Sequence, residues 1–328
     1  MTPAELLKLS GAYWSSCALH AGVKLDLFSQ LTEKPLSTAE IARLTASDQR
    51  GMGMLLDALT SLELIRKGAG GYCATPFSAE FLSKKSEKYL GYIIRHHQHL
   101  MTGWSQLDQV VKNGVPLGIS SSSTNDETIR ECFLMGMHNM ASQSAPLVAP
   151  AMDLRGRRRL LDLGGGPGTY AINFCKHNPE LQAVVYDLPT TRTFAERNVE
   201  RFGLSDRISF VPGNITQDHI GSGFDVVWIS QLLHSEGPQS AEAILKKAAR
   251  ALVPGGLMVV QEFILDDTRS APPFPALFSL NMLINTVAGQ SYSQAELAGM
   301  LTGAGAKNIS RVALELPNGA GIMTGTVG

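Results

Sequence analysis

The sequence predicts an α/β fold in which a doubly wound, mostly parallel sheet follows a mainly α-helical region. From about residue 155, short apolar runs bounded by Gly, Pro or Asp read as buried strands: "RLLDLG", "AVVYDL", "ISFVPG", "FDVVWIS" and "GLMVVQEF". Helical stretches such as "TTRTFAERNVERFG" and "SAEAILKKAARALVPGG" separate most of them. This alternation is typical of parallel strands covered by helices on both faces.

Before about residue 150 the apolar residues recur at helical spacing. Three helices are expected over "AYWSSCALHAGVKLDLF", "STAEIARLT" and "RGMGMLLDALTSLELI", and "RKGAGGYCATP" predicts a small hairpin with glycines at its tip. In the second helix, a serine and a threonine ahead of Glu40 form a plausible cap. The order of three helices and a hairpin is that of a winged helix, so a DNA-binding regulator is one candidate function.

The charge pattern favours a packing role for this region. The third helix has a single basic residue, Arg50, and the whole chain has 28 Lys and Arg against 29 Asp and Glu. A groove reader needs several phosphate contacts. We therefore expect no nucleic-acid partner, and we expect the apolar residues Trp14, Leu19, Leu27 and Phe28 to pack against a second copy of the chain in a homodimer.

Composition narrows the class of protein further. Hydrophobic residues make up 44% of the chain and charged residues 17%, which is typical of a globular protein with a large core. The four cysteines lack paired spacing, so we expect neither a disulfide framework nor a metal site, and a reducing compartment. With no signal-peptide pattern and no apolar stretch of about 18 residues, the sequence predicts a cytoplasmic protein without a membrane partner.

A glycine-rich turn predicts a ligand site. "LLDLGGGPGTYAINF" places Gly164, Gly166 and Gly168 between a strand and a helix, and Asp187 ends the next strand in "VVYDLP". Such glycines admit a ligand close to the backbone, and an acid there accepts the hydroxyls of a ribose. The pair favours an adenosine-type cofactor. Two alternatives remain: a tight turn needs glycine in any case, and Asp187 is also placed to cap the helix starting near Thr190. An NAD-dependent dehydrogenase is disfavoured by the glycine spacing.

Several motifs together resemble a known family. "LLDLGGGPGTYAINF", "YDLP", "WISQLLHSEGP", "ALVPGGLMVVQEFIL" and "LNMLINTVAGQSYSQAELAGMLTGAG" resemble the class I S-adenosylmethionine-dependent O-methyltransferases that have an N-terminal winged-helix dimerisation domain, typified by caffeate and acetylserotonin methyltransferases. The resemblance covers nearly the whole chain. It implies a Rossmann-like sheet of seven strands whose last two, "NISRVALEL" and "GIMTGTVG", form a reversed hairpin.

The resemblance also implies a domain plan and a cofactor. Residues 1–100 would form the winged-helix-like dimerisation domain, and residues 101–328 the methyltransferase domain, with a helical linker over about 101–150. The cofactor would be S-adenosyl-L-methionine, with S-adenosyl-L-homocysteine as its product. The residues implied to bind it are Asp162, Gly164, Gly166, Gly168, Asp187, Leu188, Gly213, Asn214, Ile215 and Ser230. Asn214 stands where the family usually has aspartate, and Ser230 where plant members have lysine.

His234 follows an apolar strand and is the candidate general base. An imidazole is well suited to remove the proton of a hydroxyl near neutral pH, and the resemblance implies this role, with Glu262 holding the other ring nitrogen. The family pattern is incomplete here. Ser291 stands in place of a second glutamate, Tyr292 in place of an arginine, and Ser235 in place of an aspartate after the histidine.

The acceptor is expected to be a small, aromatic molecule with a hydroxyl group. Its candidate pocket is lined by large apolar side chains and two amides, namely Trp104, Phe133, Met137, Phe274, Asn281, Met282 and Asn285. Ordinary core packing is the alternative for any one of them. Because the family acids are replaced, methylation of carbon or nitrogen, or a reaction that transfers no methyl group, also remains open.

Overall fold

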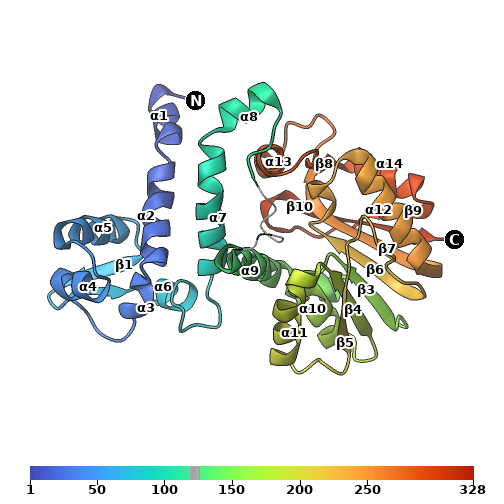
Figure 1. Ribbon diagram of the computed structural model, residues 1–328, viewed down its shortest axis with the longest axis horizontal. Helices are drawn as coiled ribbons and strands as arrows, with labels where there is room; N and C mark the ends of the chain where they lie inside the picture. Colours follow the sequence, from blue (N-terminus) through green and yellow to red (C-terminus); the bar gives the residue numbers. More distant parts are fainter. Residues whose placement is uncertain (119–123, 125) are drawn as a thin grey trace. The chain divides into compact units, whose positions relative to one another are not determined.

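The computed structural model describes residues 1–118, 124 and 126–328, so most of the loop expected over "GISSSSTND" lies outside the described residues. The chain divides into two compact units (Figure 1). The first comprises residues 1–101 and 131–139, and the second comprises residues 102–130 and 140–328.

The first unit is mainly helical, as predicted. Its elements are α1 (Pro3–Ser10), α2 (Tyr13–Lys24), α3 (Leu27–Gln30), α4 (Thr38–Leu44), α5 (Gln49–Ser61), β1 (Ile65–Gly68), β2 (Gly71–Ala74), α6 (Pro76–Phe81) and most of α7 (Gly91–Trp104). Strands β1 and β2 form an antiparallel hairpin. The expected helix cap is present, because Ser37 and Glu40 form a capping box at the start of α4.

The apolar surface expected at a dimer interface is only partly available. Trp14 on α2 is 69% exposed and Leu7 on α1 is 73% exposed. In contrast, Leu27 and Phe28 are fully buried in the unit's own core, next to Leu56 of α5. The prediction was wrong for these two residues, because Asp26 takes a left-handed backbone conformation, which ends α2 and starts the separate helix α3.

The second unit is built on a mostly parallel sheet. Along the sheet the strands follow the order β5 (Ile208–Pro212), β4 (Gln182–Asp187), β3 (Arg159–Leu163), β6 (Phe224–Ser230), β7 (Leu252–Leu265), β10 (Ala320–Val327) and β9 (Ala306–Arg311). The first five are parallel, and β10 runs antiparallel to both β7 and β9. This confirms the seven-stranded sheet with a reversed hairpin, to which the two-residue strand β8 (Tyr292–Ser293) adds at β7.

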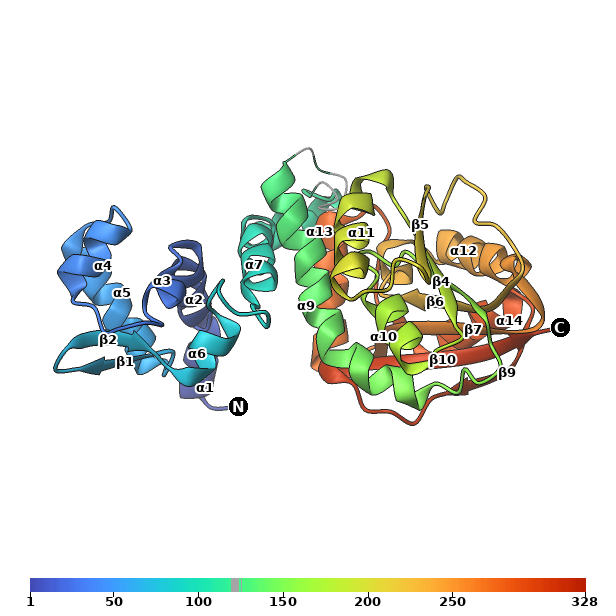
Figure 2. The same ribbon diagram turned by 90° about the horizontal axis from the view of Figure 1, so that it is seen from below.

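Helices cover both faces of this sheet (Figures 1 and 2). One face packs on α9 (Glu127–Ala151), α10 (Thr169–His177) and α11 (Arg192–Arg201), and the other on α12 (Pro238–Ala251) and α14 (Gln294–Gly303). The remaining helices are α8 (Leu107–Asn113) and α13 (Pro273–Asn285). Among the described residues, no helix has the length and apolarity that a membrane span requires.

The strand order places the site. The order β4-β3-β6-β7 reverses direction in sequence at β3, and ligands in such sheets bind beyond the carboxyl ends of the strands on either side of the reversal. The glycine turn follows β3, Asp187 ends β4, and His234 follows β6. The fold therefore brings these separate sequence motifs to one edge.

Candidate active site

The turn after β3 is shaped by glycine. Gly164, Gly166 and Gly168 have φ angles of 70°, 53° and 73°, in the left-handed region that favours glycine. A Cβ atom on Gly166 would meet no atom within 4 Å, so space is open beside it. A Cβ atom on Gly164 would lie 2.9 Å from the side chain of Leu232, in the segment after β6. The turn thus leaves open space beside Gly166, and at Gly164 it packs against the segment that carries Leu232 and His234.

Asp187 is tied to this turn. Its Oδ2 accepts a hydrogen bond from the Gly166 N–H at 2.7 Å. Its Oδ1 accepts from the Leu188 N–H at 2.6 Å and from the Thr191 hydroxyl at 3.1 Å, at the short helix η1 (Pro189–Thr191). Asp187 therefore ties the start of this short helix to the glycine turn, and its binding of a ribose stays a prediction. Burial raises the pKa of Asp187, and these hydrogen bonds oppose that rise.

The segment Gly213 to Ile215 lies beside Asp187, because the Gly213 N–H donates to the Asp187 carbonyl at 2.9 Å. The Asn214 Oδ1 accepts from the backbone N–H and the hydroxyl of Thr216, at 3.0 and 2.7 Å. The Ile215 carbonyl accepts from Lys247 at 2.6 Å. Asn214 therefore shapes its own turn, and its oxygen would have to be shared with any ligand.

Asp162 lies in the interior below the glycine turn. It is 1% exposed, and its Oδ2 accepts from the Ala171 N–H at 3.2 Å. Burial raises the pKa of Asp162 to about 7, and the nearby charge of Asp187 adds to this rise. A buried carboxyl of this kind favours a cationic ligand, because a cation stabilises its ionised form.

His234 and Glu262 form the closest pair of ionisable side chains at this edge. The Nδ1 of His234 lies 2.7 Å from Oε2 of Glu262, which is 1% exposed. The other oxygen, Oε1, accepts from the backbone N–H groups of Leu232, Leu233 and His234 at 3.0, 2.8 and 3.3 Å. Since Glu262 accepts throughout, Nδ1 is assigned as the donor, and Nε2 of a neutral imidazole is then the nitrogen able to accept a proton.

The residues that depart from the family pattern serve the local structure. Ser291 donates through its hydroxyl to the Pro275 carbonyl at 2.8 Å, which fastens its loop to α13. Ser235 donates to the Leu232 carbonyl at 2.7 Å, and Tyr292 donates to the Glu236 carbonyl at 2.5 Å. Among the described residues, none of these three hydroxyls forms a hydrogen bond with the imidazole. The carboxylate that bonds to His234 is that of Glu262.

Two phenylalanines that were not predicted contact the imidazole ring, and a third, which was predicted, packs on both of them. Phe278 on α13 stands edge-on to the ring of His234 at 4.8 Å, and Phe263 on β7 lies nearly parallel to it at 6.4 Å. Phe274, which was predicted, packs on Phe263 at 4.9 Å. Phe278 lies four residues after Phe274 on α13, so helical spacing was its signal, whereas the signal for Phe263 was its place directly after Glu262 on β7.

The amides expected in the pocket form a network of their own. Asn281 accepts from the Trp104 indole N–H at 3.1 Å, and Asn285 donates to Oδ1 of Asn281 at 3.2 Å. Met282 is buried on the same helix. Phe133 and Met137 belong to the first unit, where Phe133 packs edge-on against His96 at 5.3 Å. The structure therefore brings Trp104, Asn281 and Asn285 together in one hydrogen-bonded network. Separately, Phe274 is linked to His234 through Phe263.

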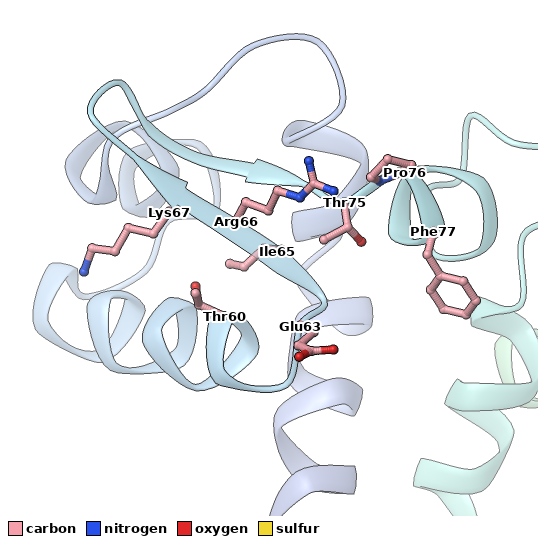
Figure 3. Close-up of a pocket in the computed structure, with 8 residues that line it drawn as sticks. All are labelled: Thr60, Glu63, Ile65, Arg66, Lys67, Thr75, Pro76 and Phe77. Atoms are coloured by element: carbon pink, nitrogen blue, oxygen red, sulfur yellow. The ribbon is translucent and has the colours of Figure 1, made fainter.

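A separate hollow of about 810 Å³ lies in the first unit, between the end of α5, β1 and the start of α6 (Figure 3). Its lining is Thr60, Glu63, Ile65, Arg66, Lys67, Thr75, Pro76 and Phe77. None of these residues was predicted to bind a ligand, and Lys67 is paired with Asp57 at 2.7 Å.

Comparison with known proteins identifies the family. The O-methyltransferase domain model matches residues 103–307, and the O-methyltransferase dimerisation domain model matches residues 7–84. The chain belongs to the O-methyltransferase family. This confirms the resemblance found in the sequence, and with it a methyltransferase that uses S-adenosylmethionine.

Individual relatives span the whole chain. A 3-hydroxy-5-methyl-1-naphthoate 3-O-methyltransferase from Streptomyces sahachiroi is 30% identical, over 98% of this chain and 95% of its own. The tetracenomycin polyketide synthesis 8-O-methyl transferase TcmO of Streptomyces glaucescens is also 30% identical, over 96% and 95%. The solved structure of an O-methyltransferase family protein from Burkholderia thailandensis superposes with a TM-score of 0.90 at 26% identity, covering 100% of this chain and 98% of that one.

The residues present fit this cofactor. The open space beside Gly166 admits a ligand against the backbone, and the buried carboxyl of Asp162 and the half-buried carboxyl of Asp187 suit a group that carries a cationic sulfonium and a ribose. Asp162, Asp187 and the glycine turn would hold it, and its chemistry would be the supply of an electrophilic methyl group.

We expect Gly213→Ala to destabilise the second unit. Its Cβ atom would lie 1.9 Å from the hydroxyl oxygen of the buried Tyr186, so the strand end or the tyrosine must shift, at a cost of about 1–3 kcal/mol. Thermal unfolding measures this cost. Gly299→Ala is the matched control, because it adds a methyl group in open space on α14 and should be neutral or slightly stabilising. Equal melting temperatures for the two variants would contradict the packing described.

We expect cofactor affinity to rise with pH through about 7. The pKa of Asp162 is raised to about 7 in the free protein, and a bound cation beside it lowers that pKa, so binding near neutral pH releases a proton. Affinity therefore increases as pH rises from 6 to 8. Calorimetry with S-adenosylmethionine in two buffers of different ionisation enthalpy measures the released proton. Asp162→Asn should flatten the pH profile, and an unchanged profile would rule out Asp162 as its source.

Proposed function

We propose that this protein methylates a hydroxyl group of a small aromatic molecule, with His234 as the general base. The observation that carries the proposal is the bond between His234 Nδ1 and Glu262, which leaves Nε2 to take the hydroxyl proton. A phenol is a poor nucleophile while it is protonated, since its pKa is about 10. Removing that proton as the new C–O bond forms is the chemistry that this side chain supplies.

Glu262 acts as a positioning residue for the base. It fixes both the backbone of the turn and the tautomer of the ring, because one carboxylate holds three N–H groups and Nδ1. As the imidazole accepts a proton it becomes a cation, and the adjacent carboxylate stabilises that charge. The same logic applies to the acid that orients the histidine in other general-base pairs.

An aromatic acceptor is supported by the surfaces near the base. Phe263, Phe274 and Phe278 form a continuous aromatic cluster with His234, and offset or edge-on ring contacts favour a flat ring beside them. Both relatives described above are named for hydroxyl groups on fused aromatic systems or polyketides. The Trp104, Asn281 and Asn285 network is the proposed polar end of this pocket.

A second candidate is methylation of carbon or nitrogen at the same site. It is favoured by Ser291, whose hydroxyl is engaged with Pro275 where the family usually has a second glutamate. An acceptor whose proton is more acidic, or one that loses no proton before methyl transfer, depends less on a general base. Analysis of products from a panel of phenols, amines and activated aromatic carbons, with isotope-labelled cofactor, separates the candidates.

We expect His234→Ala to lower the rate of methyl transfer by about 10²–10⁴-fold while leaving cofactor affinity within a few-fold of wild type, since it removes only the base. Initial rates with the best acceptor of the panel and calorimetry with S-adenosylhomocysteine measure the two effects.

Glu262→Gln tests the orienting bond in the same assay. Its amide oxygen can still accept from the backbone, but its NH₂ group cannot accept from Nδ1, so a loss of about 10–100-fold is expected. Near-normal turnover of His234→Ala would remove the base assignment and favour carbon or nitrogen chemistry.

We also propose that two chains form a homodimer through residues 1–100. Residues 101–328 would form the catalytic domain, with residues 101–150 as a helical linker. The support is the match to a dimerisation domain and the exposed apolar residues of α1 and α2, among them Leu7, Tyr13 and Trp14. An exposed apolar face of this kind marks an interaction site.

We expect Trp14→Asp to shift the protein from dimer to monomer, because it places a charge in the proposed interface. Light scattering coupled to gel filtration gives the mass. Phe77→Asp is the matched control, since Phe77 is 59% exposed on α6 of the same unit and lies outside the proposed face. A Trp14→Asp variant that stays dimeric would place the interface elsewhere.

A further inference from the structure

The turn that carries His234 is bonded through its carbonyl groups as well as through its N–H groups. Glu262 accepts from the N–H groups. On the carbonyl side, the Gln290 N–H donates to the His234 carbonyl at 2.8 Å, and the Tyr292 hydroxyl donates to the Glu236 carbonyl at 2.5 Å. Both of these donors come from the connection between α13 and β8, so a second segment of the chain holds this turn.

Two glycines allow the two segments to approach each other. A Cβ atom on Gly289 would lie 2.5 Å from the His234 carbonyl oxygen and 2.5 Å from Oγ1 of Thr286. A Cβ atom on Gly237 would lie 2.9 Å from Cβ of Ala288. A carbonyl oxygen belongs to the backbone and cannot rotate away as a side chain can, so a larger residue at position 289 forces the segments apart.

The same connection is fastened to α13. The Ser291 N–H donates to the Ser279 hydroxyl oxygen at 3.0 Å, and the Ser291 hydroxyl donates to the Pro275 carbonyl at 2.8 Å. Ser279 directly follows Phe278, whose ring stands edge-on to the imidazole of His234 at 4.8 Å. Helix α13 therefore reaches His234 twice, once through this ring contact and once through the segment that bonds the His234 carbonyl.

Tyr292 belongs to the sheet as well as to this connection. It is 1% exposed and pairs in parallel register with Ile264 on β7, two residues after Glu262. Burial raises the pKa of Tyr292, so its hydroxyl stays protonated and remains a donor. A buried hydroxyl needs an acceptor, and the one it uses is the Glu236 carbonyl in the turn after β6. The turn is thus tied to β7 by a second route, independent of the Glu262 side chain.

We propose that Gly289 and Tyr292 are positioning residues for the general base, and that residues 286–292 form a clamp that fixes His234 relative to α13. This rests on the proposed function, in which His234 takes the proton of an acceptor held beside the aromatic side chains of α13. Ser291 and Tyr292 stand where the family usually has glutamate and arginine, and here they supply fixed geometry in place of charge.

We expect Gly289→Ala to lower kcat on the order of 10²-fold and Tyr292→Phe to lower it about tenfold. The reason is that proton transfer requires Nε2 of His234 to lie within hydrogen-bond reach of the acceptor hydroxyl, and a small displacement breaks that geometry. The KM for the acceptor and the affinity for S-adenosylhomocysteine should stay within about threefold of wild type. Initial rates and calorimetry measure these quantities.

Matched controls separate positioning from stability. Gly299→Ala adds a methyl group in open space on α14, and Tyr72→Phe removes the hydroxyl of a buried tyrosine that donates to Asp57 at 2.8 Å in the first unit. Both should keep the wild-type kcat, even where Tyr72→Phe lowers the melting temperature. If Gly289→Ala folds poorly, Tyr292→Phe carries the test, because it leaves the buried ring in place.

A second readout follows His234 without any acceptor. In protein labelled with ¹³C at Cε1 of histidine, the His234 resonance is the one that disappears in His234→Ala. The ring current of Phe278, 4.8 Å away, displaces its chemical shift. Gly289→Ala and Tyr292→Phe should both move this resonance, and the two controls should leave it in place.

An unchanged His234 resonance in both clamp variants, or an equal movement in Tyr72→Phe, overturns the clamp while an inactive His234→Ala leaves the proposed function standing. A loss of cofactor affinity as large as the loss of kcat also overturns the clamp, because the variants then disturb the whole site. Near-normal turnover of His234→Ala overturns the proposed function and the clamp with it, since no base is then left to position. A lower kcat with a moved resonance and an unchanged cofactor affinity supports the clamp.

Discussion

The buried carboxylate of Glu262 is the interaction on which the rest of the site depends. Taking a carboxylate out of water costs several kcal/mol unless hydrogen bonds replace the lost hydration. Here the two oxygens accept from three consecutive backbone N–H groups and from His234 Nδ1. The chain after β6 is therefore held in one turn, and that turn presses Leu232 against the backbone of Gly164. The side chain of Glu262 thus fixes the tautomer of the His234 ring and the backbone conformation around His234. Through that backbone it also fixes how closely the segment approaches the glycine turn.

The parallel sheet explains why these groups meet. The glycine turn, Asp187, His234 and Glu262 come from four neighbouring strands, β3, β4, β6 and β7, and lie at or beyond their carboxyl ends. Backbone bonds complete the arrangement, since the Gly164 N–H donates to the Tyr186 carbonyl and the Gly213 N–H to the Asp187 carbonyl. A ligand at this edge therefore contacts backbone whose position is fixed by the sheet itself.

Much of this was predictable from the sequence, for a physical reason. Strand ends, glycine turns and the acid after the next strand are local patterns, so "LLDLGGGPGTY" and "VVYDLP" sufficed to place them. Long-range packing was not predictable in this way. The burial of Leu27 and Phe28 depends on a left-handed residue at Asp26, and the bond of Ser291 to Pro275 depends on the position of α13. Each requires knowledge of which side chains face one another.

The distribution of charge links the two ends of the proposed reaction. Asp162 is buried and Asp187 half-buried, desolvation raises the pKa of both carboxyls, and a positive group beside them is stabilised more than a neutral one. In the proposed function, methyl transfer would remove one positive charge from the cofactor side, and His234 beside Glu262 would receive the acceptor proton. Asp162 and Asp187 would then hold the product less tightly than the donor, which would favour exchange.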